Sequence, residues 1–166
     1  FLGKYVNKKE KLLFELYDSI DKYGLSCSYR GKNVPDEMKK KYKKTYYSHF
    51  NKEGYLRMRN DYNMDQSNYL LLYLLLIYGF NHMIRFNSKG IFNLPVGNVD
   101  FNKNVYNALE NYLKFRDIHE CVFSTNDYIE FLNNIDFEKS DFIYFDPPYL
   151  ISNSEYNKLW NEKNEI

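Results

Sequence analysis

The run of apolar and aromatic residues from Tyr69 to Tyr78 constrains the fold more than any other stretch of this sequence. It contains no charged residue, so a helix over these positions would have no polar face and would have to be buried on most sides. Its length is about half of what a helix needs to cross a bilayer. We therefore predict a buried helix, capped by Ser67, in a chain of 166 residues that is long enough for one real core.

Other stretches also have helical spacing or helix-start signals. Leu12, Leu16 and Ile20 fall on one stripe, and Gly24 can end that helix because glycine tolerates the left-handed conformation. Asparagine residues can act as N-terminal caps of later helices. The predicted helices are 10–23, 51–62, 102–115 and 126–134, and Pro35-Asp36-Glu37 can open a lysine-rich helix between the first two.

A short apolar run near the C-terminal end predicts a buried strand. Residues 142–145 are apolar and are bounded by charged residues. Proline supplies no donor to a β-ladder, so the strand must end at Asp146. A second strand is predicted over 120–124, and the helix between the two would complete a βαβ unit with parallel strands. Ligand sites of such sheets lie at the carboxyl ends of the strands, where Asp146 would stand.

The stretch Asp146-Pro147-Pro148-Tyr149 offers groups suited to methylation of an exocyclic amine. Such a nitrogen is a poor nucleophile because its lone pair is delocalised into the ring, and acceptors that hold its hydrogens favour the pyramidal form. The Asp146 carboxylate and the Pro147 carbonyl can be those acceptors, and Tyr149 offers a flat face to an unstacked base. The alternative is a strand that ends in an ordinary proline turn.

Residues 79–97 contain glycine, asparagine and proline at short intervals, with aromatic and basic side chains between them. This composition predicts a structured loop or hairpin directly after the buried helix. Such a segment usually carries function or a tight turn.

Charge is distributed unevenly along the chain, although the net charge is only +1. Residues 30–59 hold ten Lys/Arg against three Asp/Glu, whereas residues 99–166 hold six against thirteen. We expect the basic segment to face a polyanion, and a solvated helical face is the alternative. Cys27 and Cys121 are too few and too far apart for a disulfide framework or a metal site, which fits a reducing cytoplasm.

Two stretches upstream of Asp146-Pro147-Pro148-Tyr149 make a family resemblance specific. They are Tyr55-Leu56-Arg57-Met58-Arg59-Asn60-Asp61-Tyr62-Asn63 and Arg85-Phe86-Asn87-x-x-Gly90-x-Phe92-Asn93-x-Pro95-x-Gly97. In this order they resemble the Dam-type (D12 class) DNA adenine N6-methyltransferases, roughly over residues 45–150. The resemblance implies an α/β fold, part of a Rossmann-like methyltransferase sheet with an inserted, mostly helical target-recognition lobe. The implied divisions are an N-terminal helix leading into the lobe (1–25), the lobe with its hairpin (26–100) and a partial catalytic domain (101–166).

The resemblance assigns DNA contacts to the predicted hairpin. Phe80 would wedge into the opened base stack, and Asn81 would hold a phosphate. Arg85 can give two parallel hydrogen bonds to guanine O6 and N7. The alternatives are a structural salt bridge or phosphate contact for Arg85, and burial under the apolar helix for Phe80. The implied DNA-binding residues are Phe80, Asn81, Met83, Arg85, Asn87 and Pro95.

The resemblance also implies S-adenosylmethionine as the cofactor. Asp127 and Tyr128 match positions that line the adenosyl pocket, and Asp146 would border the same pocket. The alternative for Asp127 is a place in the first turn of the following helix, where a carboxylate interacts favourably with the helix dipole. The glycine-rich Phe-x-Gly-x-Gly loop that holds the cofactor in this family is not found in the sequence. Its absence favours an incomplete chain.

The leading interpretation is therefore a site-specific enzyme that flips an adenine out of duplex DNA and transfers a methyl group to its N6. No metal is required. A non-catalytic DNA-binding fragment of such an enzyme is the second interpretation, and a methyltransferase acting on RNA or a protein amide is the third. The implied partners are double-stranded DNA and a cognate restriction endonuclease, with no membrane involved.

Overall fold

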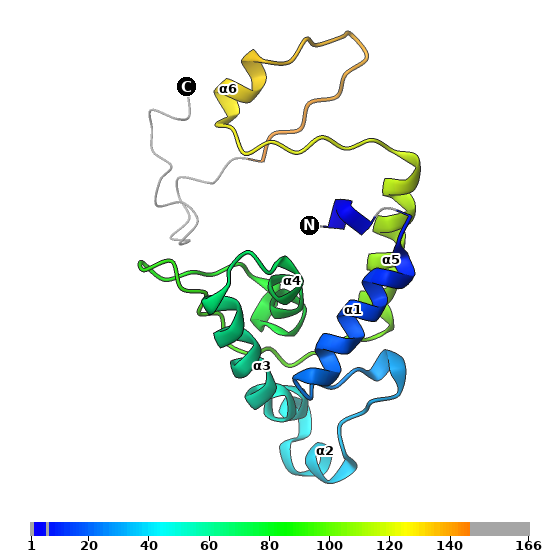
Figure 1. Ribbon diagram of the computed structural model, residues 1–166, viewed down its shortest axis with the longest axis vertical. Coiled ribbons are helices and arrows are strands. Elements are labelled where there is room, and N and C mark those ends of the chain that lie inside the picture. Colours follow the sequence, from blue (N-terminus) through cyan, green and yellow to red (C-terminus); the bar gives the residue numbers. More distant parts are fainter. Residues whose placement is uncertain (1, 6, 147–166) are drawn as a thin grey trace. The chain divides into compact units, whose positions relative to one another are not determined.

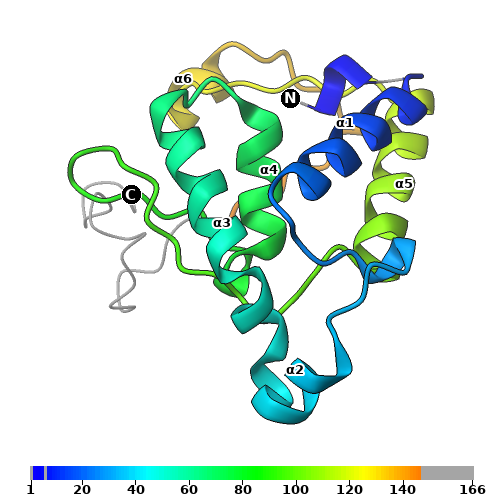
Figure 2. The ribbon, with the colours of Figure 1, turned by 60° about the horizontal axis from the view of Figure 1, so that its bottom comes forward.

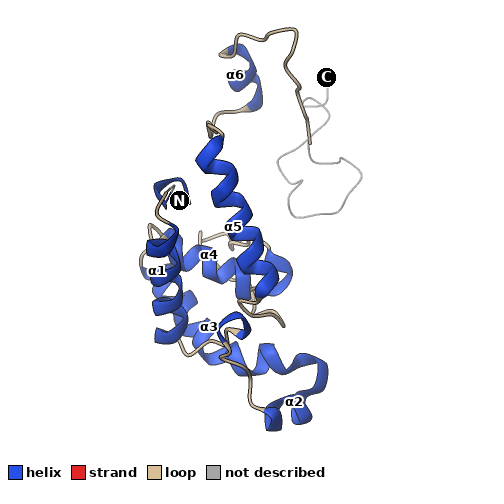
Figure 3. Ribbon diagram, turned by 90° about the vertical axis from the view of Figure 1, so that its right-hand side faces the viewer, coloured by secondary structure: helices blue, strands red, loops and turns tan. Residues whose placement is uncertain are grey.

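The computed structural model describes residues 2–5 and 7–146, which belong to two compact units, Phe1–Cys121 and Val122–Ile166. The first unit is built from helices joined by loops and single 3₁₀ turns (Figures 1 and 3). Its α-helices are α1 (Lys9–Lys22), α2 (Asp36–Tyr42), α3 (Tyr46–Met64), α4 (Tyr69–Tyr78) and α5 (Lys103–Ile118). Its 3₁₀ turns are η1 (Leu2–Tyr5), η2 (Ser28–Arg30), η3 (Lys43–Thr45) and η4 (Phe80–His82). In the second unit, α6 (Tyr128–Asn133) is the helix of the described part.

The helix α4 has the predicted bounds, and its burial confirms the inference from its composition. It packs against α3 and α1 (Figure 2). Its fully or almost fully buried residues are Leu71, Leu74, Leu75, Ile77 and Tyr78. No helix in the described part of the chain combines the length and the apolar character that crossing a membrane requires.

The predicted cap of α4 is wrong by one residue. Asn68 is the N-cap, and its Oδ1 accepts a hydrogen bond from the Leu71 backbone N–H at 3.2 Å. The Ser67 hydroxyl instead bonds Asp65 Oδ1 at 2.5 Å, within the turn that precedes the helix. Both residue types are good caps, so local sequence could not decide between neighbours.

The other predicted helices are present, with corrections at two helix starts, one of which is that Asp127 and not Asn126 caps α6 (Tyr128–Asn133). Gly24 follows α1 in the left-handed conformation, with φ of 67°, as its role as a stop requires. Asn102 caps α5 by accepting from two backbone N–H groups. However, α3 begins at Tyr46, so Asn51 lies inside the helix and does not cap it.

One contiguous core joins the helices of the first unit. The helices α1, α3, α4 and α5 contribute buried stripes, and the segment that follows α4 contributes Phe92, Leu94 and Phe101. The buried residues of the other helices are Leu12, Leu16 and Ile20 from α1, Tyr55, Met58 and Tyr62 from α3, and Leu109 and Leu113 from α5.

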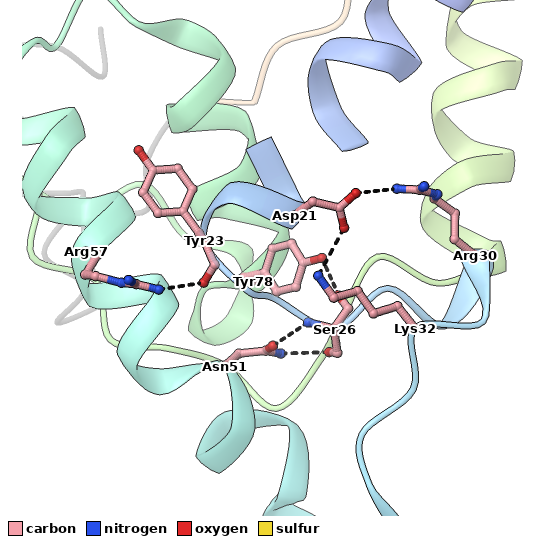
Figure 4. Close-up of polar contacts among 8 residues, drawn as sticks. All are labelled: Asp21, Tyr23, Ser26, Arg30, Lys32, Asn51, Arg57 and Tyr78. Carbon is pink, nitrogen blue, oxygen red and sulfur yellow. Dashed lines mark hydrogen bonds and ion pairs between the residues drawn. The ribbon is translucent and has the colours of Figure 1, made fainter. Parts of the chain in front are cut away.

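Asn51 is fully buried, and its amide joins three segments of the chain; Figure 4 shows its contact with Ser26. Its Oδ1 accepts from the Ser26 N–H at 2.8 Å, and its Nδ2 donates to Ser26 Oγ at 3.1 Å and to the Val99 carbonyl at 3.3 Å. The Tyr78 hydroxyl donates to the Ser26 carbonyl at 2.6 Å, which ties the end of α4 to the same point. Buried polar groups must be satisfied, so this network fixes how α3, α4 and the loop after α1 meet.

A second set of polar contacts secures the loop after α1 at its surface (Figure 4). Lys32 and Arg30 each reach the Asp21 carboxylate at 3.0 Å, and this pairing holds the pKa of Asp21 below its usual range. Arg57 of α3 donates to the Tyr23 carbonyl at 3.2 Å. These contacts are half exposed, so they fix the position of the loop but add little to the free energy of unfolding.

The predicted Rossmann-like sheet is wrong for the described residues. They form helices, loops and three isolated antiparallel bridges, and they contain no β-strand. Residues 120–124 and 141–146, where strands were predicted, have no ladder partner and expose apolar side chains, with Val122 84% and Phe142 89% exposed. An apolar run gives a segment the propensity for a strand, but a strand also needs a neighbour for its backbone groups and cover for its faces. The division into 1–25, 26–100 and 101–166 stays a prediction.

We predict that Asn51→Ala lowers the free energy of unfolding by about 2–3 kcal/mol, because it leaves the buried Ser26 N–H and the part-buried Val99 carbonyl without this partner. Chemical denaturation followed by circular dichroism measures the change. The matched control is Asn60→Ala, which removes an exposed asparagine from the same helix and is expected to change stability by less than about 0.5 kcal/mol. Equal effects of the two substitutions would contradict the role given to Asn51.

Candidate functional site

Residues 79–97 form an irregular hairpin directly after α4, as predicted. Isolated bridges pair Gly79 with Val96 and Phe86 with Phe92. We call residues 83–87 the outgoing limb and residues 90–95 the return limb. Backbone hydrogen bonds between the limbs link Asn93 N–H to the Arg85 carbonyl at 3.1 Å and Asn87 N–H to the Ile91 carbonyl at 2.9 Å.

The base of the hairpin depends on two glycines. A Cβ on Gly79 would lie 2.4 Å from the Leu94 side chain and 2.5 Å from the Leu75 carbonyl, and one on Gly97 would lie 2.6 Å from the Gly79 carbonyl. The Gly97 N–H donates to the Tyr78 carbonyl at 2.7 Å, which closes the hairpin on the end of α4. The two ends therefore approach more closely than side chains allow.

Asn87 organises the tip of the hairpin. Its Oδ1 accepts from the N–H groups of Lys89 and Ile91 at 2.9 and 3.0 Å, and its carbonyl accepts from Gly90, which has a φ of 71°. This is a side-chain-stabilised turn of the kind that asparagine favours. The DNA contact of Asn87 stays a prediction. In the structure, the side-chain Oδ1 and the backbone carbonyl of Asn87 stabilise this turn.

Arg85 is half-buried and is held along one edge of its guanidinium group. Its Nε donates to Asn93 Oδ1 and its Nη2 to the Asn93 carbonyl, both at 2.9 Å. These partners are an amide and a carbonyl, so the alternative of a salt bridge does not describe this contact. A guanidinium has five N–H donors, so the Nη1 side keeps donors for another acceptor.

The turn η4 presents Phe80 to solvent, with 51% of the residue exposed. The alternative in which Phe80 is buried under α4 is therefore wrong. Asn81 and His82 both have φ above 50°, a left-handed conformation that costs energy for residues other than glycine. The His82 Nδ1 lies 2.9 Å from the Leu76 carbonyl, which helps to hold the turn against the end of α4. The structure thus contains an exposed aromatic ring on a strained and well-held turn.

The remaining predicted hairpin residues differ in their surroundings. Met83 is half-buried and packs against the core, whereas Pro95 is exposed and its carbonyl accepts from the Phe80 N–H at 2.9 Å. All six residues predicted to contact DNA therefore belong to one hairpin of the first unit. Their contacts with DNA stay predictions.

The lysine-rich segment lies in the same unit and is exposed. Lys40, Lys41, Lys43 and Lys44 are exposed, while Lys39 pairs with Asp36 at 2.9 Å across one helical turn. Asn98, just beyond the hairpin, donates to the Lys44 carbonyl and accepts from the Ser48 N–H at 3.2 Å. The base of the hairpin and the basic segment are therefore linked by a short polar contact.

In the second unit, Asp127 lies at the start of α6, one position before the first turn in which the helix alternative placed it. It is the N-cap of α6, and its Oδ1 accepts from the Ile129 N–H at 3.0 Å. Tyr128 follows with 39% of the residue exposed, and Asp146 is exposed at the end of the described chain. Pro147, Pro148 and Tyr149 lie outside the described residues. The cofactor and catalytic roles of all these residues stay predictions.

Sequence reasoning missed a polar stripe on α3 that contacts the hairpin. Its members recur at intervals of three or four, which places them on one face of the helix. Tyr55 and Arg59 each donate to the Leu94 carbonyl at 3.1 Å. Burial raises the pKa of Tyr55 above its ordinary value, so it donates as a neutral phenol. The stripe consists of Tyr55, Arg59 and Asn63 of α3, and it is continued by Gln66 in the turn that follows the helix. The spacing was visible in the sequence, but its partner was not.

Comparison with known proteins places this arrangement in a family. The sequence matches the D12 class of N6 adenine-specific DNA methyltransferases over residues 11–165. It is 31% identical over 167 residues to modification methylase StsI of Streptococcus sanguinis, an alignment that covers 94% of this chain and 21% of the relative. It is 30% identical over 165 residues to type II methyltransferase M.FokI of Planomicrobium okeanokoites, with 95% and 22% covered.

Modification methylase LlaI of Lactococcus lactis subsp. lactis is 31% identical over 106 residues, which cover 64% of this chain and 17% of that protein. The chain thus spans about a fifth of the length of the curated relatives it matches. The family match includes the α3 stripe, the hairpin and the Asp146 stretch, and so this chain belongs to the D12 class of N6 adenine-specific DNA methyltransferases.

Proposed function

We propose that the protein containing this chain flips an adenine out of duplex DNA and methylates its N6 at a specific site. The observation that carries the proposal is the family match over residues 11–165, which spans both the hairpin and Asp146. This match favours DNA over RNA or a protein amide as the substrate. It also favours an enzyme over a DNA-binding fragment without activity, since the Asp146 stretch lies within it.

The charge and shape of the first unit support two separate kinds of DNA contact. Exposed lysines of α2 and η3 supply attraction to phosphates, which is independent of sequence. Arg85, held by Asn93 along one edge, is the candidate for reading a base with its remaining donors. The exposed Phe80 on its strained turn is the candidate for filling the space that a flipped base leaves.

Family membership implies a methyl donor, and we propose S-adenosylmethionine. The residues fit such a ligand, because a carboxylate has about four sites for hydrogen bonds and the cap uses one oxygen of Asp127. Asp127 would accept from the adenine amino group of the cofactor, and Tyr128 would line the pocket. S-adenosylmethionine, when bound, supplies the methyl group from its sulfonium.

The Asp146 carboxylate would accept a hydrogen bond from the amino group of the flipped adenine. This contact favours the pyramidal nitrogen and stabilises the positive charge that develops on N6. The Pro147 carbonyl would be the second acceptor and Tyr149 the stacking surface, with Pro148 fixing the backbone between them. The names of the relatives include two modification methylases, and we therefore propose a cytoplasmic restriction-modification role with a cognate endonuclease that cuts the same site.

We predict that Asp146→Ala in the full-length protein lowers the rate of single-turnover methylation by roughly a hundredfold or more and leaves DNA affinity nearly unchanged. The reason is that Asp146 acts on the flipped amine, whereas affinity for the duplex comes mainly from phosphate contacts. Asp136→Ala, which removes another exposed carboxylate of the same unit, is the control. Turnover like that of the wild type in Asp146→Ala would refute the role.

We predict that Asp127→Ser keeps the N-cap of α6 but removes the contact with the cofactor. Serine keeps an acceptor for the N–H groups of the first turn, so α6 should stay protected from hydrogen exchange. It removes the carboxylate, so affinity for S-adenosylmethionine measured by calorimetry should fall by about tenfold. Asp127→Ala should lose both properties. An unchanged affinity in Asp127→Ser would restrict Asp127 to its helix cap.

We predict different signatures for Arg85 and the lysines in a salt series of DNA affinities. Arg85→Ala should reduce the preference for the cognate duplex by about 1–3 kcal/mol with little change in salt dependence. Lys40→Ala combined with Lys44→Ala should weaken all duplexes together and reduce the slope against log salt by about one unit per charge. An equal loss for every duplex in Arg85→Ala would make Arg85 a phosphate or structural residue.

A further inference from the structure

The return limb of the hairpin is hydrogen-bonded on both of its edges. Residues 91 and 93 bond the outgoing limb through their backbone groups. The carbonyls of Gly90, Phe92 and Leu94 alternate with those residues. The Phe92 and Leu94 carbonyls accept hydrogen bonds from α3 side chains, and the Gly90 carbonyl accepts one from Gln66 in the turn after α3. Backbone groups of an extended segment point alternately to its two sides, so the α3 stripe occupies the place of a neighbouring strand.

Asn63 makes the most strand-like of these contacts. Its Nδ2 donates to the Phe92 carbonyl at 3.0 Å, and its Oδ1 accepts from the Phe92 N–H at 2.9 Å. The side-chain amide thus pairs with both backbone groups of one residue, as the facing residue of an antiparallel strand would. A shift of the return limb by one residue would break both bonds, so Asn63 fixes the register of this limb.

The register of the return limb matters for Arg85 because the residue after Phe92 holds it. Asn93 binds Arg85 Nε and Nη2, and its N–H donates to the Arg85 carbonyl. The two hydrogen bonds at Phe92 therefore fix the position of Asn93, which orients the Arg85 guanidinium group. The ring of Phe92 is buried between Tyr62 and Phe86, with centroids 5.8 and 5.3 Å away, which secures the limb but not the orientation of its peptide groups.

We propose that Asn63 is a positioning residue for base recognition, which acts by fixing Phe92 and through it Asn93 and Arg85. The proposal rests on the proposed function, because it presumes that Arg85 reads a base. Its consequence is that loss of Asn63 lowers discrimination between DNA sequences without lowering the general affinity for DNA. Arg59 and Gln66 hold the two ends of the limb, at Leu94 and Gly90, and are the supporting contacts.

The first test measures the hairpin without DNA, by hydrogen exchange of the full-length protein. Asn63→Ala should accelerate exchange at the Phe92 and Asn93 amides by about tenfold or more, while the amides of α1 stay as protected as in the wild type. Asn60→Ala, an exposed asparagine of the same helix, is the matched control and should change neither set. Unchanged protection of Phe92 in Asn63→Ala would overturn the proposal.

The second test measures discrimination with a pool of duplexes that carry a randomised centre. The sequence most enriched by the wild type and its single-base variants are then used for affinity measurements. Asn63→Ala should reduce the ratio of cognate to substituted affinity by roughly tenfold, with the affinity for the substituted duplexes unchanged. The double variant with Arg85→Ala should lose no more discrimination than Arg85→Ala alone, because both act through one contact.

The outcomes separate this inference from the function on which it rests. A wild-type protein that enriches no sequence would contradict the proposed function and this inference together. If the wild type is selective, three results would overturn this inference alone. Asn63→Ala could keep the selectivity of the wild type, or it could lower the affinity for all duplexes equally. In the double variant, the losses of discrimination could instead add. If Asn63→Ala does not fold, Gln66→Ala removes the exposed end of the stripe, and we expect its discrimination to fall by roughly two- to threefold. The same criteria then decide the proposal.

Discussion

Burial of α4 is the constraint on which the first unit depends. A helix without a polar face needs cover on most sides, and α1, α3 and the return limb of the hairpin provide it. Its last residue, Tyr78, is fully buried and bonds the Ser26 carbonyl, so the end of α4 is held in place. Since the hairpin starts at the next residue, Gly79, the buried helix also fixes where the hairpin leaves the core.

The helix α3 has two roles, because it packs in the core beside α4 and also supports the hairpin. One stripe of the helix, with Met58 and Tyr62, packs in the core. The neighbouring stripe, with Arg59 and Asn63, is half-buried and bonds the hairpin backbone. In the second turn of the helix, Asn51 fixes α3 to the loop after α1. The orientation of α3 is thereby set at both ends, and a rigid helix carries the support of the hairpin.

Local patterns in the sequence were enough to predict the helices and the hairpin. Apolar periodicity and composition gave α1 and α4, because these signals arise within a few turns of the chain. The start of α3 and the cap of α4 were misplaced because Asn51 and Ser67 are good caps in isolation. In the structure Asn51 bonds the distant Ser26, and Ser67 bonds Asp65 in the preceding turn. The predicted sheet failed for a similar reason. Pairing of strands is a long-range property, and an apolar run such as 142–145 does not supply its own partner.

The candidate site was predictable only through motif resemblance, and its supports were not predictable at all. Arg85 and Phe80 were predicted to contact DNA because the order of the motifs resembles that of a family. The contact between Arg85 and Asn93 and the pairing of Asn63 with Phe92 join a side chain to a backbone group. Such contacts leave no periodic pattern, and the spacing of Arg59, Asn63 and Gln66 resembles that of any solvated helix face.

The support of the hairpin through its backbone has a consequence for how specificity can change. Arg59, Asn63 and Gln66 bond carbonyl or N–H groups of the return limb, which every residue type other than proline offers. Side chains such as Ile84 and Ile91, which are 55% and 40% exposed, take no part in this support. Substitutions at such positions would change the surface that the hairpin exposes while its register stays the same. If the hairpin reads DNA as we propose, a support that holds the backbone and leaves the exposed side chains unconstrained allows the recognised sequence to change while the core beneath it stays the same.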